Sequence, residues 1–223
     1  MKLAHPGMFR IIEFAENIAN VLVIENQPLL RRATAELLSQ VSSGVGEFVL
    51  SDDENSKIEL GKAAEIITDP LQLDMNERRF QTKINQEAMK ACCAELEKET
   101  AEFLMSAGRL GAAVTSMLDF SVDYTLPLDV SGLLKLLGLH IDTEGMQLPE
   151  RLLEYMKLCR NFFGKRLFVF LNLKSFLSEK ELVHFYSAVF YEKFDILLLE
   201  SVQRQKVCGI ERISIIDGDL CDI

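Results

Sequence analysis

The chain has 223 residues, with 24 Lys and Arg against 34 Asp and Glu, so its formal net charge is −10. A content of 48% hydrophobic and 26% charged residues is ordinary for a globular protein and excludes the disordered and collagen-like classes. No apolar run approaches the roughly 20 residues of a membrane helix, and the acidic balance argues against loose, non-specific binding to nucleic acid or anionic membrane. The five cysteines, with Cys92 and Cys93 adjacent, lack the spacing of a disulfide framework, which indicates reduced thiols in a cytosolic chain.

Six short β-branched or apolar runs predict strands, several of them covered on both faces as in a parallel sheet. They are Val21–Ile24, Glu47–Leu50, Ala64–Thr68, Leu167–Leu171, Asp195–Glu200 and Arg212–Ile216. Between the first two, Pro28–Val41 has a helical pattern with Asn26 as N-cap and Gly44 near its end. Ser178 and Glu181 have the spacing of a capping box before a further helix, so the strands on either side of it form a βαβ unit.

The middle of the chain has a helical pattern instead. Apolar residues recur every three or four positions from about Leu71 to Leu118, and one helix of this length would reach roughly 65–70 Å, so we expect a bend at Gly108 and Gly111. Two shorter helices are predicted after it, Leu128–Leu137 and Leu148–Phe162. The prediction is therefore a split α/β head domain over 1–68 and 150–223, with a long inserted helical leg domain over 69–149 that projects from it.

The sequence offers little for catalysis. His5, His140 and His184 stand in unrelated contexts, and HExxH, GxSxG and CxxC are all absent. The phosphate loop GxxxxGK[ST] is absent as well, so no backbone cradle exists for a nucleotide phosphate. No lysine follows an Asp or Glu by two positions, which excludes the commonest pattern of metal-dependent nucleases. We predict that the protein is not an enzyme.

Charged clusters are the remaining candidates for binding sites. Asp119, Asp123 and Asp129 allow a hard cation to bind if their loop folds back on itself, or else they cap helices and keep the surface soluble. Basic residues gather at the start of the long helix, at Arg78, Arg79 and Lys83, with smaller groups at Arg31-Arg32, Lys165-Arg166 and Arg204 to Arg212. Each basic group is either a solvated, salt-bridged surface, which is the commoner case, or a phosphate site.

Five collinear motifs resemble those of the CRISPR-associated adaptation protein of type II-A systems. The run Ile66-Ile67-Thr68-Asp69, followed by Leu71, Leu73-Asp74, Met75 and Asn76, resembles the family's strand-to-helix junction. Residues 133–141 resemble its Leu-x-Lys-x-Leu-Gly-Ile-x-Ile segment, and 164–172, 176–182 and 195–200 continue the match in order. The resemblance spans nearly the whole chain.

The resemblance implies a protein of antiviral defence that acts in acquiring new spacers and has no enzymatic activity. Members form ring-shaped homotetramers whose hole accepts double-stranded DNA at free ends, without sequence preference, and they depend on calcium for assembly or DNA binding. Their head resembles a P-loop NTPase without the phosphate loop, and it carries an inserted helical leg. The CRISPR integrase and effector nuclease are the implied partners, and the implied location is cytoplasmic, away from membranes.

A tetramer of this chain would carry 4 × (−10) = −40 charges, so a ring can hold DNA only with its cations turned inward. We expect Arg78, Arg79, Lys83 and Lys135 to line that wall and to contact phosphates, which position DNA without reading its sequence. If each subunit neutralises two phosphates, Z is about 8 and log K falls with log salt at a slope of roughly −7.

Calcium is the point at which this sequence departs from the family. Members are rich in Asp and Glu after the long helix, whereas the matching stretch Asp119–Asp129 holds only three acids, Asp119, Asp123 and Asp129. These three are the metal-binding candidates, and the calcium dependence of this member stays open. Two other functions also remain: an assembly adaptor that docks the integrase or effector nuclease with only incidental DNA contact, and a degenerate nucleotide-binding regulator.

Overall fold

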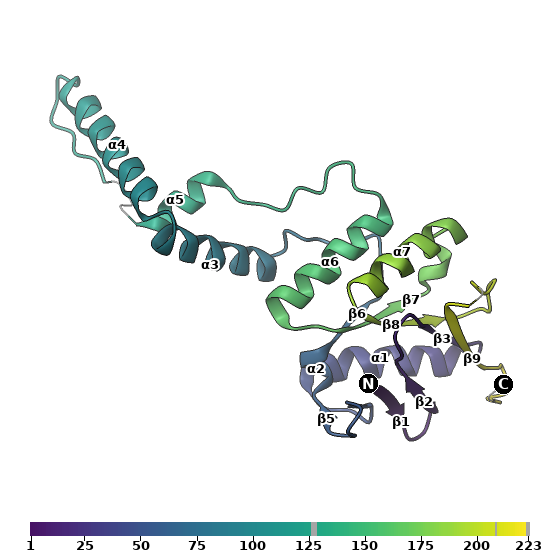
Figure 1. The fold of residues 1–223 in the computed structure, drawn as a ribbon. Coiled ribbons are helices and arrows are strands. Elements are labelled where there is room, and N and C mark those ends of the chain that lie inside the picture. The colour runs from purple at the N-terminus through teal and green to yellow at the C-terminus, as the bar shows by residue number, and fades with distance from the viewer. Residues whose placement is uncertain (126–128, 208, 222–223) are drawn as a thin grey trace. The chain divides into compact units, whose positions relative to one another are not determined.

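The chain forms two compact units in the computed structural model, which describes residues 1–125, 129–207 and 209–221 (Figure 1). The α/β unit comprises Met1–Leu73 and Thr143–Ile223, and the helical unit comprises Asp74–Asp142. Both boundaries of the helical unit fall inside the predicted insertion of 69–149. None of the helices in the described ranges combines the length and apolar character that a bilayer span requires.

The α/β unit is built on a five-stranded parallel sheet with the order β6-β7-β8-β3-β9. Its strands are β3 (Ala19–Ile24), β6 (Ala64–Ile67), β7 (Leu167–Leu171), β8 (Asp195–Glu200) and β9 (Glu211–Ile216). Five of the six predicted strands lie in this sheet, and β7 and β8 begin and end at the predicted residues. The predicted α/β class is confirmed.

Helices cover the sheet at positions that local signals fix. They are α1 (Gln27–Ser43), α2 (Leu60–Ala63), α6 (Leu148–Phe163), the 3-10 helix η1 (Leu173–Ser175) and α7 (Glu179–Tyr191). The Asn26 side chain caps α1 by accepting from the Leu29 N–H at 3.0 Å, as predicted. Gly44 ends α1 with φ 76°, a left-handed conformation that glycine adopts without steric cost. Ser178 and Glu181 form the predicted capping box of α7.

Apolar side chains project from both faces of the parallel sheet and pack against other elements. On one face, Leu199 shares a core with Leu37 of α1 and Leu3 of a second sheet. On the other face, the ring of Phe170 meets that of Phe185 on α7 at a centroid distance of 5.7 Å. Figure 1 shows α1 on one side of the strands and α6 and α7 on the other. Burial on both faces explains why the strands read as continuous apolar runs.

The second sheet of the α/β unit is antiparallel, with the order β2-β1-β4-β5. Its strands are β1 (Lys2–His5), β2 (Phe9–Glu13), β4 (Val49–Ser51) and β5 (Lys57–Ile58). Of these strands, only β4 was predicted, by the run Glu47–Leu50, which overlaps it. The others were missed because strands of two to five residues with one face exposed hold too few residues to show a period.

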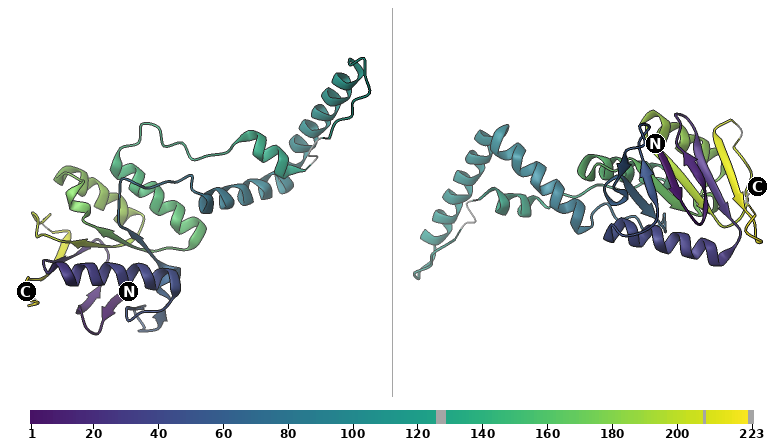
Figure 2. Two further views of the ribbon diagram at one scale, coloured as in Figure 1. Left: turned by 180° about the vertical axis from the view of Figure 1, so that it is seen from behind. Right: turned by 90° about the horizontal axis from the view of Figure 1, so that it is seen from below.

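The prediction of one long helix bent at Gly108 and Gly111 is wrong. The helical unit has two helices here, α3 (Arg78–Ala94) and α4 (Glu97–Ser116), which diverge at residues 95–96 (Figure 2). Both glycines lie within α4, and Tyr124 packs against the helix beside them. A Cβ on Gly111 would lie 2.5 Å from the Tyr124 ring, and the Tyr124 hydroxyl donates to the Gly108 carbonyl at 3.0 Å.

The last helix of this unit is α5 (Val130–Leu137), which packs against α3. Leu128, the first residue of the predicted helix, lies outside the described residues; the helix ends at Gly138 as predicted, with φ 60°. Asn76 joins the two ends of the unit, since its Oδ1 accepts from the Ile141 N–H at 2.7 Å and its Nδ2 donates to the Ile141 carbonyl at 3.0 Å. The segments before α3 and after α5 are therefore held together by paired hydrogen bonds.

Candidate nucleic-acid interface

The positive charge of the helical unit is concentrated on α3. This helix carries four basic residues and one acidic residue, a net charge of 4 − 1 = +3 in a chain of net charge −10. The basic residues are Arg78, Arg79, Lys83 and Lys90, and the acidic residue is Glu87. Three of the four predicted DNA-binding residues therefore lie on one helix. The fourth, Lys135, lies in the last turn of α5, the helix that packs against α3.

Three of the four predicted residues have charged side chains that are not paired with any other described residue. The side chains of Arg78, Lys83 and Lys135 make no hydrogen bond or ion pair with any of the described residues. Arg78 and Lys135 are exposed and Lys83 is half-buried. A guanidinium or ammonium in this state is free to meet a phosphate, because no carboxylate has to be displaced first.

Arg79 differs from its neighbours. Its Nε donates to the Glu77 carboxylate at 2.6 Å, and its guanidinium lies 4.8 Å from the centroid of the Phe80 ring. Phe80 is fully buried. These contacts hold Arg79 against its own unit, so it is the least available of the four predicted residues. Lys90, which was not predicted, is paired with Glu87 at 2.7 Å and is likewise engaged.

In the smaller basic groups of the α/β unit, several side chains already form hydrogen bonds within the unit. Lys165 is buried, and its Nζ donates to the carbonyls of Gly61 and Ala64, the latter at 2.8 Å. It is a structural lysine, and the interpretation of 165–166 as a surface basic pair is wrong for this residue. Arg204 donates to the Ser175 hydroxyl at 2.9 Å and Arg212 to the Glu13 carbonyl at 2.9 Å.

The predicted metal ligands do not form a group in this structure. Asp119 and Asp123 are exposed, and one oxygen of Asp123 accepts from the Tyr124 N–H at 2.8 Å. Asp129 is the N-cap of α5, accepting from the Gly132 N–H at 2.8 Å. In the part of the chain that the structure describes, the carboxylate oxygens of these three residues do not all lie within 4.8 Å of one another. Calcium binding by Asp119, Asp123 and Asp129 stays a prediction.

A different group, which sequence reasoning missed, brings His5, Glu36 and Glu47 together. The His5 Nε2 lies 3.0 Å from Glu36 Oε1 and 3.7 Å from a Glu47 oxygen. Partial burial opposes ionisation of Glu36, but hydrogen bonds from the Glu47 N–H and from His5 outweigh it and lower the Glu36 pKa. These residues are far apart in sequence and have no shared motif, so no sequence signal could have found them.

The hydrogen bonds of His5 disfavour a metal at this group. Its Nδ1 accepts from the Gly7 N–H at 3.1 Å, so the neutral ring carries its proton on Nε2 and donates it to Glu36. A metal at Nε2 would have to displace that proton, and the ring would then present an N–H to the Gly7 N–H. Metal-bound histidines instead donate their second N–H to a carbonyl or carboxylate.

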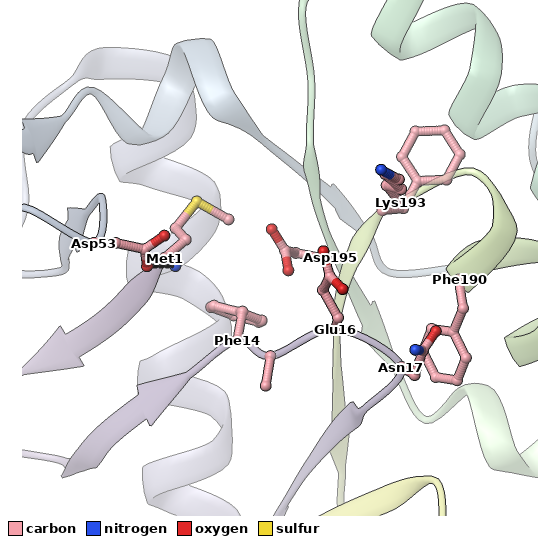
Figure 3. Close-up of a pocket in the computed structure, with 10 residues that line it drawn as sticks. Met1, Phe14, Glu16, Asn17, Asp53, Phe190, Lys193 and Asp195 are labelled. Atoms are coloured by element: carbon pink, nitrogen blue, oxygen red, sulfur yellow. Dashed lines mark hydrogen bonds and ion pairs between the residues drawn. The ribbon is translucent and has the colours of Figure 1, made fainter.

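A cavity of about 410 Å³ lies in the α/β unit beside the first residue of β8 (Figure 3). Carboxylates of Glu16, Asp53 and Asp195 line it, together with Lys193 and the Met1 amine. Burial raises the pKa of Asp195, while the Met1 ammonium lowers that of Asp53 through a hydrogen bond of 2.5 Å. The surplus of carboxylates repels phosphate, so the cavity does not extend the candidate nucleic-acid interface.

The comparisons with known proteins point to one family. The family model described as "CRISPR-associated protein (Cas_Csn2)" matches residues 40–220. Comparison with curated proteins finds no match. A solved structure titled "Putative ABC transporter (ATP-binding protein)" from Pyrococcus furiosus is similar at a TM-score of 0.38 and 11% identity, over 92% of this chain and 88% of that chain, too weak a likeness to support an argument. Because the family model spans most of the α/β unit and all of the helical unit, the chain belongs to the Cas_Csn2 family of CRISPR-associated proteins.

Proposed function

We propose that this protein is a non-catalytic, double-stranded DNA-binding protein of CRISPR spacer acquisition, acting in the cytoplasm as a homotetrameric ring that encircles linear DNA ends without sequence preference. Family membership supports the CRISPR role. The observation that carries the DNA-binding part is the net charge of +3 on α3, in a chain of net charge −10, with Arg78 and Lys83 unpaired among the residues that the structure describes.

The balance of charges supports encirclement. A duplex that approaches an arbitrary face of an acidic protein meets mostly carboxylates, and the encounter is repulsive. A ring that turns four copies of α3 and Lys135 toward its hole presents cations on several sides of the duplex at once. The contacts are to phosphates, which are the same in every sequence, so binding has no sequence preference.

Self-assembly needs an interface, and α4 offers one. Phe103, Ala107, Leu110, Val114 and Met117 are spaced alternately by four and three residues, the heptad spacing of helices that pack in pairs. We call this row the α4 seam. None of the residues of α4 is buried, and Leu110 and Met117 are 66% and 83% exposed. Tyr124 covers a different side of α4, at Gly108 and Gly111, so the seam is left for a second copy of this chain.

The proposal includes calcium and protein partners. Exposed carboxylates of Asp119 and Asp123, and the second oxygen of Asp129, are hard ligands, and backbone carbonyls or water would complete the 6–8 oxygens that calcium takes. The CRISPR integrase and effector nuclease are the proposed partners, and the alternative function is an adaptor that docks them with only incidental DNA contact. An adaptor would use the α4 seam for those proteins instead of for a second copy.

The first prediction concerns the salt dependence of DNA binding. Replacing Arg78 and Lys83 together by alanine should make the slope of log K against log salt less negative by about 0.9 for each phosphate that is no longer neutralised. Fluorescence anisotropy with a linear duplex over a series of salt concentrations measures this slope. Lys90→Ala is the matched control on the same helix, because Lys90 is already paired with Glu87. A wild-type slope in the double variant would remove α3 from the interface.

The second prediction distinguishes a ring from an open binding surface. In a gel shift with one sequence prepared as linear and as covalently closed circular duplex, only the linear form should bind, because a closed ring needs a free end to thread. Equal binding to both forms would contradict encirclement. Negligible binding to either would favour the adaptor.

The third prediction concerns the α4 seam. Leu110→Glu with Val114→Glu places charges in a packed seam, so light scattering should show loss of the tetramer, while far-ultraviolet circular dichroism stays unchanged because neither residue is buried within the chain. Met105→Glu is the control, since Met105 is exposed on the opposite side of α4. The seam is not the interface if the double variant keeps the wild-type mass, or if Met105→Glu disrupts assembly equally.

The fourth prediction separates capping from calcium binding at Asp129. Asn caps a helix as well as Asp, so Asp129→Asn should keep the melting temperature without calcium and reduce the rise that millimolar calcium produces. A site occupied at 100 times its Kd stabilises the wild type by about 2.7 kcal/mol. Asp219→Asn, at an exposed acid of the α/β unit, is the control. A wild-type melting temperature that calcium leaves unchanged would exclude a structural calcium site.

A further inference from the structure

The α/β unit buries an unequal number of acids and bases at the carboxyl end of β8. Glu200, Glu211, Lys174 and Tyr186 are all buried there, with Glu200 only 1% exposed. We call these four residues the buried acid cluster. They come from β8, β9, η1 and α7, so the cluster joins four elements of the unit.

Both carboxylate oxygens of Glu211 have hydrogen-bond partners within the cluster or beside it, whereas only one oxygen of Glu200 has a partner in the described part of the chain. Glu211 Oε1 accepts from the Tyr186 hydroxyl at 2.7 Å and lies 2.9 Å from Lys174 Nζ, and its Oε2 accepts from the Val207 N–H at 2.9 Å. Glu200 Oε1 accepts from the Lys174 backbone N–H at 3.0 Å, but its Oε2 is buried with no hydrogen-bond partner among the described residues. The single ammonium of the cluster is therefore committed to Glu211.

The charge count leaves Glu200 as the group that must stay neutral. Lys174 and Glu211 cancel, so an ionised Glu200 would add an unpaired negative charge in the interior. Burial raises the pKa of Glu200 to about 7; Lys174 and Arg204 oppose the rise and Glu211 adds to it. Tyr186 does not compete for the proton near neutral pH, since burial and Glu211 raise its pKa further.

The cluster also contacts residues 201–207, the first part of the connection from β8 to β9. Lys174 Nζ donates to the Gln205 carbonyl at 2.8 Å, and Glu211 receives the Val207 N–H. Ser201 and Arg204 add hydrogen bonds to Asn172 at 2.8 Å and to Ser175 at 2.9 Å. The Lys174 ammonium therefore binds both the Glu211 carboxylate and the backbone of residues 201–207.

We propose that Glu200 is a proton-binding site that latches segment 201–207 onto the α/β unit, closed while the carboxyl is neutral and released when it ionises. An ionised Glu200 competes with Glu211 for the Lys174 ammonium and draws it from the Gln205 carbonyl. Opening of the segment also lowers the free-energy cost of a buried negative charge on Glu200, because water can then hydrate the carboxylate oxygen that has no hydrogen-bond partner among the residues described.

The sign of the pH dependence follows from linkage. With the segment open, Glu200 titrates near its ordinary value of 4.5, and with the segment closed it titrates near 7. Below the ordinary value both states are protonated and the latch is at full strength. Between the two values only the closed state holds the proton, so the latch weakens about tenfold per pH unit and levels off above the raised value.

Hydrogen–deuterium exchange of the full chain from pH 5 to 8.5 tests the latch. After correction for intrinsic exchange, protection of the amides in 201–207 should fall about tenfold per pH unit up to roughly neutral pH and then level off. Glu200→Gln should make that protection independent of pH. Glu25→Gln, at an exposed acid directly after the neighbouring strand β3, is the matched control and should behave as wild type.

Protection that is flat in the wild type, or a pH dependence that survives in Glu200→Gln, would overturn the proposal. Should Glu200→Gln fail to fold, a carbon-13 NMR titration of the wild-type Glu200 carboxyl decides the question. A midpoint near neutrality supports a proton-binding site, and a midpoint near the ordinary value of a glutamate refutes it.

Discussion

Burial of the parallel sheet on both faces is the constraint on which the rest of the structure depends. Each central strand must find apolar partners above and below, and α1 and α7 supply them from opposite sides. The helical unit is inserted between β6 and β7, which are neighbours in the sheet with Ala64 opposite Leu167. The sheet therefore closes across the insertion, and the Arg166 N–H to Ala63 carbonyl bond of 2.8 Å continues the pairing beyond the strand. Because the entropy of closing a loop grows slowly with its length, about 0.6 kcal/mol per doubling, a large insertion at this position is tolerated.

Sequence reasoning succeeded where one physical signal acts locally. β7 and β8 were predicted to the residue because a strand covered on both faces leaves a continuous apolar run. Caps at Asn26 and Ser178 were predicted because a short polar side chain before a helix satisfies its free N–H groups. The break at 95–96 was not predictable, since Cys92 and Leu96 continue the helical period and neither glycine nor proline marks the place.

In the candidate interface, too, the features with a local sequence signal were predicted and those without one were missed. The spacing of Arg78, Arg79 and Lys83 placed three cations at the start of a helix, and α3 begins at that point. The sequence could not show that Arg79 is withdrawn, because its partner Glu77 lies two residues away, outside the spacing at which helical side chains meet. The burial of Lys165 was equally hidden, since its partners, the backbone carbonyls of Gly61 and Ala64 and the Glu65 carboxylate at 3.8 Å, lie about 100 residues away in sequence.

Charge within the helical unit sets a geometric condition on any DNA complex. The unit Asp74–Asp142 has 7 basic and 11 acidic residues, a net of 7 − 11 = −4, and without the +3 of α3 the remainder is −4 − 3 = −7. The cations are densest on α3, whereas on α4 Lys98 and Arg109 are outnumbered by Glu97, Glu99 and Glu102. A phosphate backbone attracted to α3 loses part of that gain if the acids of α4 and its flanks come within a Debye length, about 8 Å at physiological salt. Attraction that is strong on one helix and reversed on the next selects one orientation of the duplex. In the proposed ring, several copies of α3 would face a common axis and fix that orientation.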